Sequence, residues 1–159
     1  YESFGVEPDL IALAKGMGSG FPVGALLARK QISEHLTPGS HGTTYGANPL
    51  ATNVANTVIN IIKEKAFLDN VNRQGDYLLT GLERLRQEID LISDLRGMGL
   101  MIGIEVSCDP KDAIAKLRDN KMLATQAGSN TIRLTPPLTI EQAEADHAID
   151  ILERTLKAM

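Results

Sequence analysis

The first part of the chain alternates short apolar runs with glycine-rich connections. Residues 9–14 (DLIALA) form an apolar run bounded by Pro8 and Gly16, and a second run, VGALLAR, follows Pro22. Runs this short are typical of buried strands rather than helices, and proline and glycine end them. We therefore predict two buried strands, joined by a glycine-rich connection, in the middle of a larger sheet.

A polar stretch and a helix come next. Residues 33–45 are rich in Gly, Thr and His, which predicts a loop. Asn48 is a typical helix N-cap, and Pro49 occupies the first helical position, where its missing N–H group is not needed. Apolar residues then recur at helical spacing and predict one buried helix face, formed by Ala51, Val54, Ala55, Val58 and Ile62.

A longer helical pattern follows Lys65. Its apolar positions lie on one side and its polar positions on the other, which predicts an amphipathic helix over residues 66–90 that links two bodies. The apolar side consists of Phe67, Val71, Leu78, Leu82, Leu85 and Ile89.

Two strands are predicted after this helix. Residues 100–106 alternate apolar side chains with Met101, Gly103 and Glu105, which is the period of a strand with one buried face. Residues 131–135 (TIRLT) form the second strand, which the following pair of prolines ends because proline cannot donate to a ladder.

Two helices are predicted between and after these strands. Asp109 and Pro110 repeat the cap-plus-proline start, and Thr139 with Gln142 has the spacing of a capping box. The order strand, helix, strand, helix predicts a compact α/β subdomain that begins near residue 90. The face of the last helix consists of Ala145, Ala148, Ile149, Leu152 and Leu156.

Composition excludes several classes of protein. The chain has 159 residues, of which 43% are hydrophobic and 23% charged, as in a folded globular protein. Its net charge is -4 and it has no basic run, so we expect no nucleic-acid partner. No apolar run approaches the roughly 20 residues that span a bilayer. We therefore expect no membrane partner and a cytoplasmic location.

The sequence predicts no metal site and no disulfide framework. Cys108 is the only cysteine, and a lone cysteine is usually a small buried hydrophobe. The three histidines and the scattered acids show no metal-ligand spacing.

Lys15 is the first candidate for chemistry, because it follows a predicted buried strand. Open α/β sheets bind ligands at the carboxyl ends of their strands. Burial disfavours the charged ammonium form, so a neutral amine becomes available as a nucleophile toward a carbonyl group. The glycines that follow, in GMGSG, allow close approach of a cofactor. By spacing alone, a lysine that ends a strand and points to solvent is the simpler interpretation.

Two further segments could bind anions. In HGTTYGANP (residues 41–49), Thr43 and Thr44 offer hydroxyl and N–H donors beside a helix start, and such donors favour the binding of a phosphate or carboxylate. A polar loop before an N-cap explains the segment equally well. Arg133 is forced onto the face of its strand opposite Ile132 and Leu134, where its guanidinium could hold a carboxylate with two hydrogen bonds. An exposed arginine on an edge strand is the alternative.

Together, four segments resemble the class III (ω-amino acid) aminotransferases, which are pyridoxal-phosphate enzymes of fold type I. The matching segments are DLIALAKGMGSGFPVGA, HGTTYGANPLA, RGMGLMIGIE and TIRLTPPLTI. The resemblance implies an α/β fold made of the end of the large-domain sheet and a small C-terminal domain. It divides the chain into the C-terminal part of the cofactor-binding large domain (1–65), a linking helix (66–90) and the small domain (91–159).

The resemblance also implies roles for individual residues. Lys15 would carry pyridoxal 5'-phosphate covalently and move a proton between substrate and cofactor. Thr44 would hold the cofactor phosphate of the neighbouring subunit, Thr43 would face the substrate, and Arg133 would bind a substrate carboxylate. We expect amino acid and 2-oxo acid substrates and a homodimer with a shared active site.

The same resemblance implies that an upstream half is missing from this sequence. That half would supply the carboxylate at the pyridine nitrogen and further cofactor contacts, so we expect the isolated chain to be inactive. The identity of the amino donor stays open among several ω-amino acids. A non-catalytic fragment or interaction module is the interpretation from a different class of function.

Overall fold

The computed structural model describes residues 1–159, which divide into two compact units, Tyr1–Glu64 and Lys65–Met159. We describe each unit by itself. No helix in the chain is both long and apolar enough to cross a membrane.

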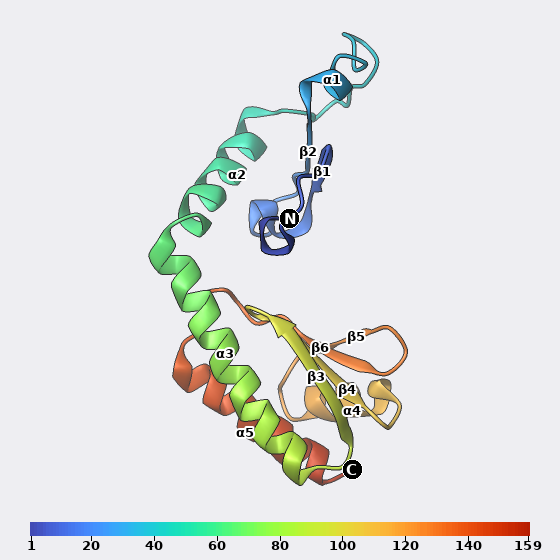
Figure 1. Ribbon diagram of the computed structural model, residues 1–159, viewed down its shortest axis with the longest axis vertical. Coiled ribbons are helices and arrows are strands. Elements are labelled where there is room, and N and C mark those ends of the chain that lie inside the picture. The colour runs from blue at the N-terminus through green and yellow to red at the C-terminus, as the bar shows by residue number, and fades with distance from the viewer. The chain divides into compact units, whose positions relative to one another are not determined.

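The first unit contains short elements and a two-stranded antiparallel sheet (Figure 1). Its strands pair from Leu10 opposite Ala28 to Leu13 opposite Ala25. The elements in chain order are η1 (Glu2–Phe4), β1 (Leu10–Leu13), η2 (Lys15–Gly18), β2 (Ala25–Ala28), α1 (Lys30–Ser33) and α2 (Pro49–Ile62).

The strands of the first unit exist as predicted, but the prediction that they are buried is wrong. Leu10, Leu26 and Leu27 are 50%, 59% and 48% exposed. The apolar runs located the strands correctly, because short apolar runs bounded by proline and glycine are strand-like. Within this unit, however, two strands have no second layer that could cover them.

The start of α2 follows the predicted cap. The Asn48 side-chain oxygen accepts a hydrogen bond from the Ala51 N–H at 2.9 Å, and its amide nitrogen donates to the Tyr45 carbonyl at 2.8 Å. The predicted apolar face is only partly buried. Ala51 and Ala55 are buried, whereas Val54, Val58 and Ile62 of the same face are half-buried.

The second unit is an antiparallel four-stranded sheet, in the order β3-β4-β6-β5, with helices packed on one face. In Figure 1, α3 and α5 run alongside each other against this sheet. The elements in chain order are α3 (Lys65–Glu88), β3 (Ile92–Met98), β4 (Met101–Val106), α4 (Pro110–Asp119), β5 (Thr125–Ala127), β6 (Thr131–Leu134) and α5 (Gln142–Lys157).

A continuous hydrophobic core lies between the sheet and the helices. Ile102 and Ile104 of β4 and Ile132 of β6 are fully buried. They meet Leu82 of α3 and Leu152 of α5, which are also fully buried. The predicted helical faces and the predicted alternation of β4 are therefore confirmed, because each supplies side chains to one core.

The opposite side of the sheet, which we call the outer face, carries the charged side chains of the strands together with the exposed Met98 and Met101. Its side chains alternate with the buried ones, so the register decides which of them are neighbours. Arg96 pairs with Gly103, Gly103 pairs with Arg133, and Arg133 pairs with Thr125. These four residues therefore form one row across all four strands.

The sequence patterns missed two strands and misplaced one cap. β3 and β5 were not predicted, and β3 forms a hairpin with β4 through Gly99. The predicted capping box of Thr139 with Gln142 is wrong. The structure places the N-cap at Glu141, whose side chain accepts from the backbone of Glu144 while the Glu144 side chain accepts from the Glu141 N–H at 2.9 Å.

The long amphipathic helix α3 packs against β3, β4 and α5 of its own unit. Its buried positions include Leu78, Leu82 and Leu85, as the helical spacing predicts. The division of the chain into a large-domain part, a linking helix and a small domain stays a prediction.

Candidate functional site

Lys15 lies directly after β1, at the first position of η2. Its backbone φ is 53°, in the left-handed region that residues other than glycine rarely adopt. Such a conformation costs about 1–3 kcal/mol and is common at functional sites. The residue is exposed, which agrees with the simpler interpretation of a lysine that ends a strand, and the burial that would favour its neutral amine is absent in this chain. The physical reason is the uncovered sheet described above.

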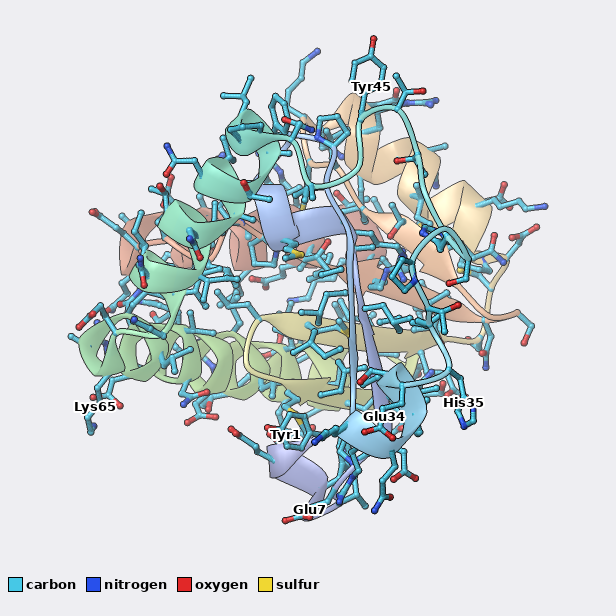
Figure 2. The ribbon with its side chains drawn as sticks, turned by 90° about the horizontal axis from the view of Figure 1, so that it is seen from above. Tyr1, Glu7, Glu34, His35, Tyr45 and Lys65 are labelled. Atoms are coloured by element: carbon cyan, nitrogen blue, oxygen red, sulfur yellow. The ribbon has the colours of Figure 1, made fainter.

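The loop that precedes α2 lines a cavity of about 770 Å³ in the first unit. Thr43 contributes to its wall, together with His41, Gly42 and the first turn of α2. Neither Thr44 nor Lys15 is among the lining residues. Tyr45, which is 82% exposed, projects away from the ribbon (Figure 2). The N–H groups at the start of α2 give this end of the cavity a partial positive charge.

Arg133 occupies the outer face of β6, as the sequence predicts. Ile132 and Leu134 are buried on the other face, and Arg133 is exposed. Its Nε donates a hydrogen bond to the Thr125 hydroxyl at 3.2 Å. Arg133 also lines an outer-face cavity of about 380 Å³, shared with Arg96, Gly103 and Thr131.

The charged side chains of the four strands differ in whether they form ion pairs. They are Asp94, Arg96, Glu105 and Arg133. A terminal nitrogen of Arg96 lies 2.9 Å from Glu105 and 3.7 Å from Asp94, whereas Arg133 takes part in no ion pair. Arg133 is therefore the cation of this face that is available to an external anion.

Sequence reasoning missed the roles of Arg96 and Glu105. Both lie in the segment RGMGLMIGIE, which the sequence identified only as a strand. The alternation of β4 places Glu105 on the polar face, but its pairing with Arg96 depends on the unpredicted strand β3.

The structure groups some of the predicted site residues and not others. Lys15, Thr43 and Thr44 belong to the first unit, and Arg133 belongs to the second. Of these four residues, only Thr43 lines the cavity of about 770 Å³ in the first unit. The chain contains no cluster of three His, Cys, Asp or Glu side chains that could hold a metal ion. Burial raises the pKa of the Cys108 thiol, which disfavours its nucleophilic thiolate form.

The model of the family "Aminotransferase class-III" matches residues 1–156, and the chain belongs to this family. Class III aminotransferases depend on pyridoxal phosphate and have fold type I, and the fold of this chain is a part of that fold.

Within this family, the chain is similar to particular curated relatives. The chain is 43% identical over 158 residues to the acetylornithine aminotransferase of Clostridium acetobutylicum, covering 99% of this chain and 41% of the relative. It is 40% identical over 157 residues to that of Listeria monocytogenes, covering 99% of this chain and 41% of the relative. The chain thus spans about two fifths of the length of the curated relatives it matches.

Solved structures of two kinds of aminotransferase are similar to the chain. The acetylornithine aminotransferase from Elizabethkingia anophelis has a TM-score of 0.89 at 31% identity, covering 99% of this chain and 43% of that chain. Plasmodium falciparum ornithine delta-aminotransferase has a TM-score of 0.90 at 30% identity, covering 99% of this chain and 42% of that chain.

The first unit carries groups of the kinds that pyridoxal phosphate binds: an amine, hydroxyl groups and a helix start. No hydrogen bond or ion pair engages the amine of Lys15, so it is available to an aldehyde. Thr43 and Thr44 supply hydroxyl groups, and the start of α2 favours negative charge such as that of a phosphate.

Proposed function

We propose that the chain is the C-terminal part of a longer pyridoxal-phosphate-dependent aminotransferase that exchanges amino groups between N-acetylornithine and 2-oxoglutarate, a reaction of arginine biosynthesis. One observation carries this proposal. The curated relatives that match nearly the whole chain, at 40% and 43% identity, are named acetylornithine aminotransferase.

The first unit would supply cofactor-binding residues. Lys15 would hold pyridoxal phosphate through its amine, and Thr44 would hold a cofactor phosphate. The bound cofactor supplies an electron sink for breaking a carbon–hydrogen bond beside the amino nitrogen. Lys15 would also be the base that moves the proton. Thr43, on the cavity wall, would face the substrate.

The second unit would supply a substrate-binding residue. Arg133 has its Nε occupied by Thr125, so its terminal nitrogens remain for a carboxylate of 2-oxoglutarate or glutamate. Its lack of an ion pair supports this role, because an arginine already paired with an acid would have to give up that partner.

The remaining parts of the proposal concern the whole enzyme. We propose that the whole enzyme is a homodimer, in which Thr44 reaches the cofactor of the neighbouring subunit. We also propose that the isolated chain does not catalyse the reaction. The cytoplasmic location stays a prediction.

A second substrate has a specific observation in its favour. The ornithine delta-aminotransferase named above matches the fold as well as the acetylornithine enzyme does, with TM-scores of 0.90 and 0.89. Ornithine is therefore the alternative amino donor. Succinylornithine and 4-aminobutyrate stay open as donors, and a non-catalytic interaction module stays open as a function.

Covalent labelling tests the assignment of Lys15. The longer enzyme is loaded with pyridoxal phosphate, reduced with borohydride and digested, and the labelled peptide is identified by mass spectrometry. We expect the label on Lys15 and its loss in Lys15→Gln. Lys63→Gln, which changes another exposed lysine of the same unit, is the matched control and should keep the label. A label on any other lysine contradicts the assignment.

Substrate comparison tests the reaction. We expect kcat/KM with N-acetylornithine to exceed that with ornithine or 4-aminobutyrate, with 2-oxoglutarate as acceptor. A higher value with ornithine favours the alternative donor. A labelled enzyme that transaminates none of these donors leaves the family intact and rejects the proposed reaction.

A further inference from the structure

Thr125 and Arg133 face each other across the β5–β6 pair of the second unit. They are register partners in this antiparallel pair. Register partners lie on the same face of a sheet, with their Cβ atoms about 4.5–5.5 Å apart. Burial on the other face fixes the register of β6, because Ile132 and Leu134 belong to the core. The packing of the second unit itself therefore places Thr125 beside Arg133.

A hydrogen bond joins these two side chains. The Nε–H group of Arg133 donates to the Thr125 hydroxyl oxygen at 3.2 Å. Threonine is β-branched, so its χ1 angle is restricted and its hydroxyl oxygen is held in a defined direction. The guanidinium group is planar, so a hydrogen bond at Nε restrains the direction of its two terminal nitrogens as well.

The position of this hydrogen bond decides which nitrogens a carboxylate meets. Arginine binds a carboxylate through two parallel N–H groups. These can be the two terminal nitrogens, or Nε and one terminal nitrogen. Because Nε already donates to Thr125, the pair that remains consists of the two terminal nitrogens. The long side chain of an arginine also loses rotamer freedom when it binds, and a restraint already present in the free protein lowers this cost.

We propose that Thr125 is a positioning residue, which orients Arg133 so that its two terminal nitrogens face a substrate carboxylate. This inference rests on the proposed function, in which Arg133 binds that carboxylate. Thr125 acts through the guanidinium group and does not itself contact the substrate. The role belongs to the hydroxyl group, so a side chain of similar shape that lacks a hydroxyl should not replace threonine.

The test measures the binding of glutarate, an unreactive dicarboxylate, to the full-length, cofactor-loaded enzyme by calorimetry. Thr125→Val removes the hydroxyl, keeps the branched shape and is favourable in a strand. We expect this variant to raise the Kd of glutarate about fivefold, which corresponds to ~1 kcal/mol. The KM for 2-oxoglutarate should rise by a similar factor, while kcat and the absorbance spectrum of the bound cofactor stay unchanged. Unchanged glutarate binding overturns the proposal.

Two further variants test whether the effect belongs to the hydroxyl at position 125. Thr125→Ser keeps the hydroxyl, so its Kd should stay within about twofold of the wild-type value. A loss as large as that in Thr125→Val contradicts the proposal. Thr80→Val is the matched control, because Thr80 is an exposed threonine of the same unit whose hydroxyl donates to the Asp76 carbonyl within α3. This control should bind glutarate normally, and a loss in it would also contradict the proposal.

A double variant tests whether the hydroxyl acts through Nε of Arg133. Lysine has a methylene group where arginine has Nε, so Arg133→Lys removes the donor of this hydrogen bond. In the Arg133→Lys background we therefore expect Thr125→Val to change the Kd by less than about twofold, because the two residues act as a coupled pair. A further loss as large as that in the wild-type background would mean that Thr125 acts through the fold of the strand pair, and would overturn the proposal.

A crystal structure of the glutarate complex tests the geometry. We expect one carboxylate of glutarate to accept hydrogen bonds from the two terminal nitrogens of Arg133, while Nε still donates to Thr125. A carboxylate that instead takes the hydrogen bond of Nε overturns the proposal.

Failure of the proposed function would be recognised separately. Arg133→Lys should weaken glutarate binding, because lysine cannot form the two-pronged contact. If wild type does not bind glutarate, or if Arg133→Lys binds it normally, the role of Arg133 fails. If Arg133→Lys binds glutarate weakly and Thr125→Val binds it normally, only the role of Thr125 fails.

Discussion

The two units of the chain differ in how much apolar surface they bury. The second unit has nineteen buried hydrophobic residues in one cluster, drawn from all three of its helices and from its sheet. The first unit buries only Gly18, Ala51 and Ala55. Burial of apolar surface is the main force that stabilises folded proteins. The second unit therefore contains the basis of its own stability, and the first does not.

The candidate residues of the two units differ in how firmly their backbone is held. Arg133 lies on a sheet whose other face belongs to the core, so its backbone is held firmly. Lys15 and the threonines lie in the unit with little internal packing, where Leu10 and Leu26 remain about half exposed. We infer that precise placement of the proposed cofactor-binding residues requires protein surface beyond this unit, in keeping with the proposed longer enzyme.

The largest expected effect comes from truncating one leucine in each unit. Leu82 is fully buried, so Leu82→Ala should lower the free energy of unfolding of the chain by about 2–5 kcal/mol. Leu27 is 48% exposed, so Leu27→Ala should change it by about 0.5 kcal/mol or less. Urea unfolding followed by circular dichroism measures both. Equal losses would show that the first unit has a core of its own.

A smaller effect is expected from a matched pair of glycines. A Cβ atom on Gly75 of α3 would lie 2.3 Å from the backbone oxygen of Gly99. Gly75→Ala should therefore force α3 away from the β3–β4 hairpin and cost about 1–3 kcal/mol.

Gly16 of the first unit is the control for this substitution, because a Cβ atom there has no neighbour within 4 Å. Gly16→Ala should change the free energy of unfolding by about 0.5 kcal/mol or less. A destabilisation by Gly16→Ala as large as that by Gly75→Ala would remove the contrast in packing between the units. Both are measured by thermal and urea unfolding of the chain.

The smallest expected effect is on the pH dependence of stability, and it arises from a contact between α3 and α5. The Tyr77 hydroxyl donates a hydrogen bond to Asp146, and this bond raises the pKa of Tyr77. A group whose pKa is raised by folding stabilises the protein at pH values below its pKa in the unfolded state, which is about 10 for tyrosine. This contribution is lost as the pH rises through the pKa of the folded state.

We therefore expect the free energy of unfolding to fall less at alkaline pH in Tyr77→Phe than in wild type. Urea unfolding at neutral pH and at pH ~11, above the ordinary tyrosine value, measures the difference. The effect is small because the pair is exposed to solvent. Parallel alkaline losses in the two proteins would mean that this contact does not contribute to the stability of the second unit.

Several elements were predictable because their signals are local. Asn48 and Asp109 cap α2 and α4 as predicted, since a cap bonds to backbone within a few residues of itself. The alternation of residues 131–134 placed Arg133 opposite Ile132 and Leu134. The strand β3 was missed because Asp94, Arg96 and Gly97 interrupt its apolar pattern, and only pairing with β4 makes it a strand.

By itself, the sequence determined where most helices and strands lie and which residue types could carry chemistry. It did so because backbone preference and side-chain alternation act over a few neighbouring positions. Only the tertiary structure decided that Leu10 and Leu26 stay exposed and that Glu105 pairs with Arg96 rather than Arg133. Burial and ion pairing depend on residues far apart in the chain, which come together only through strand register and packing.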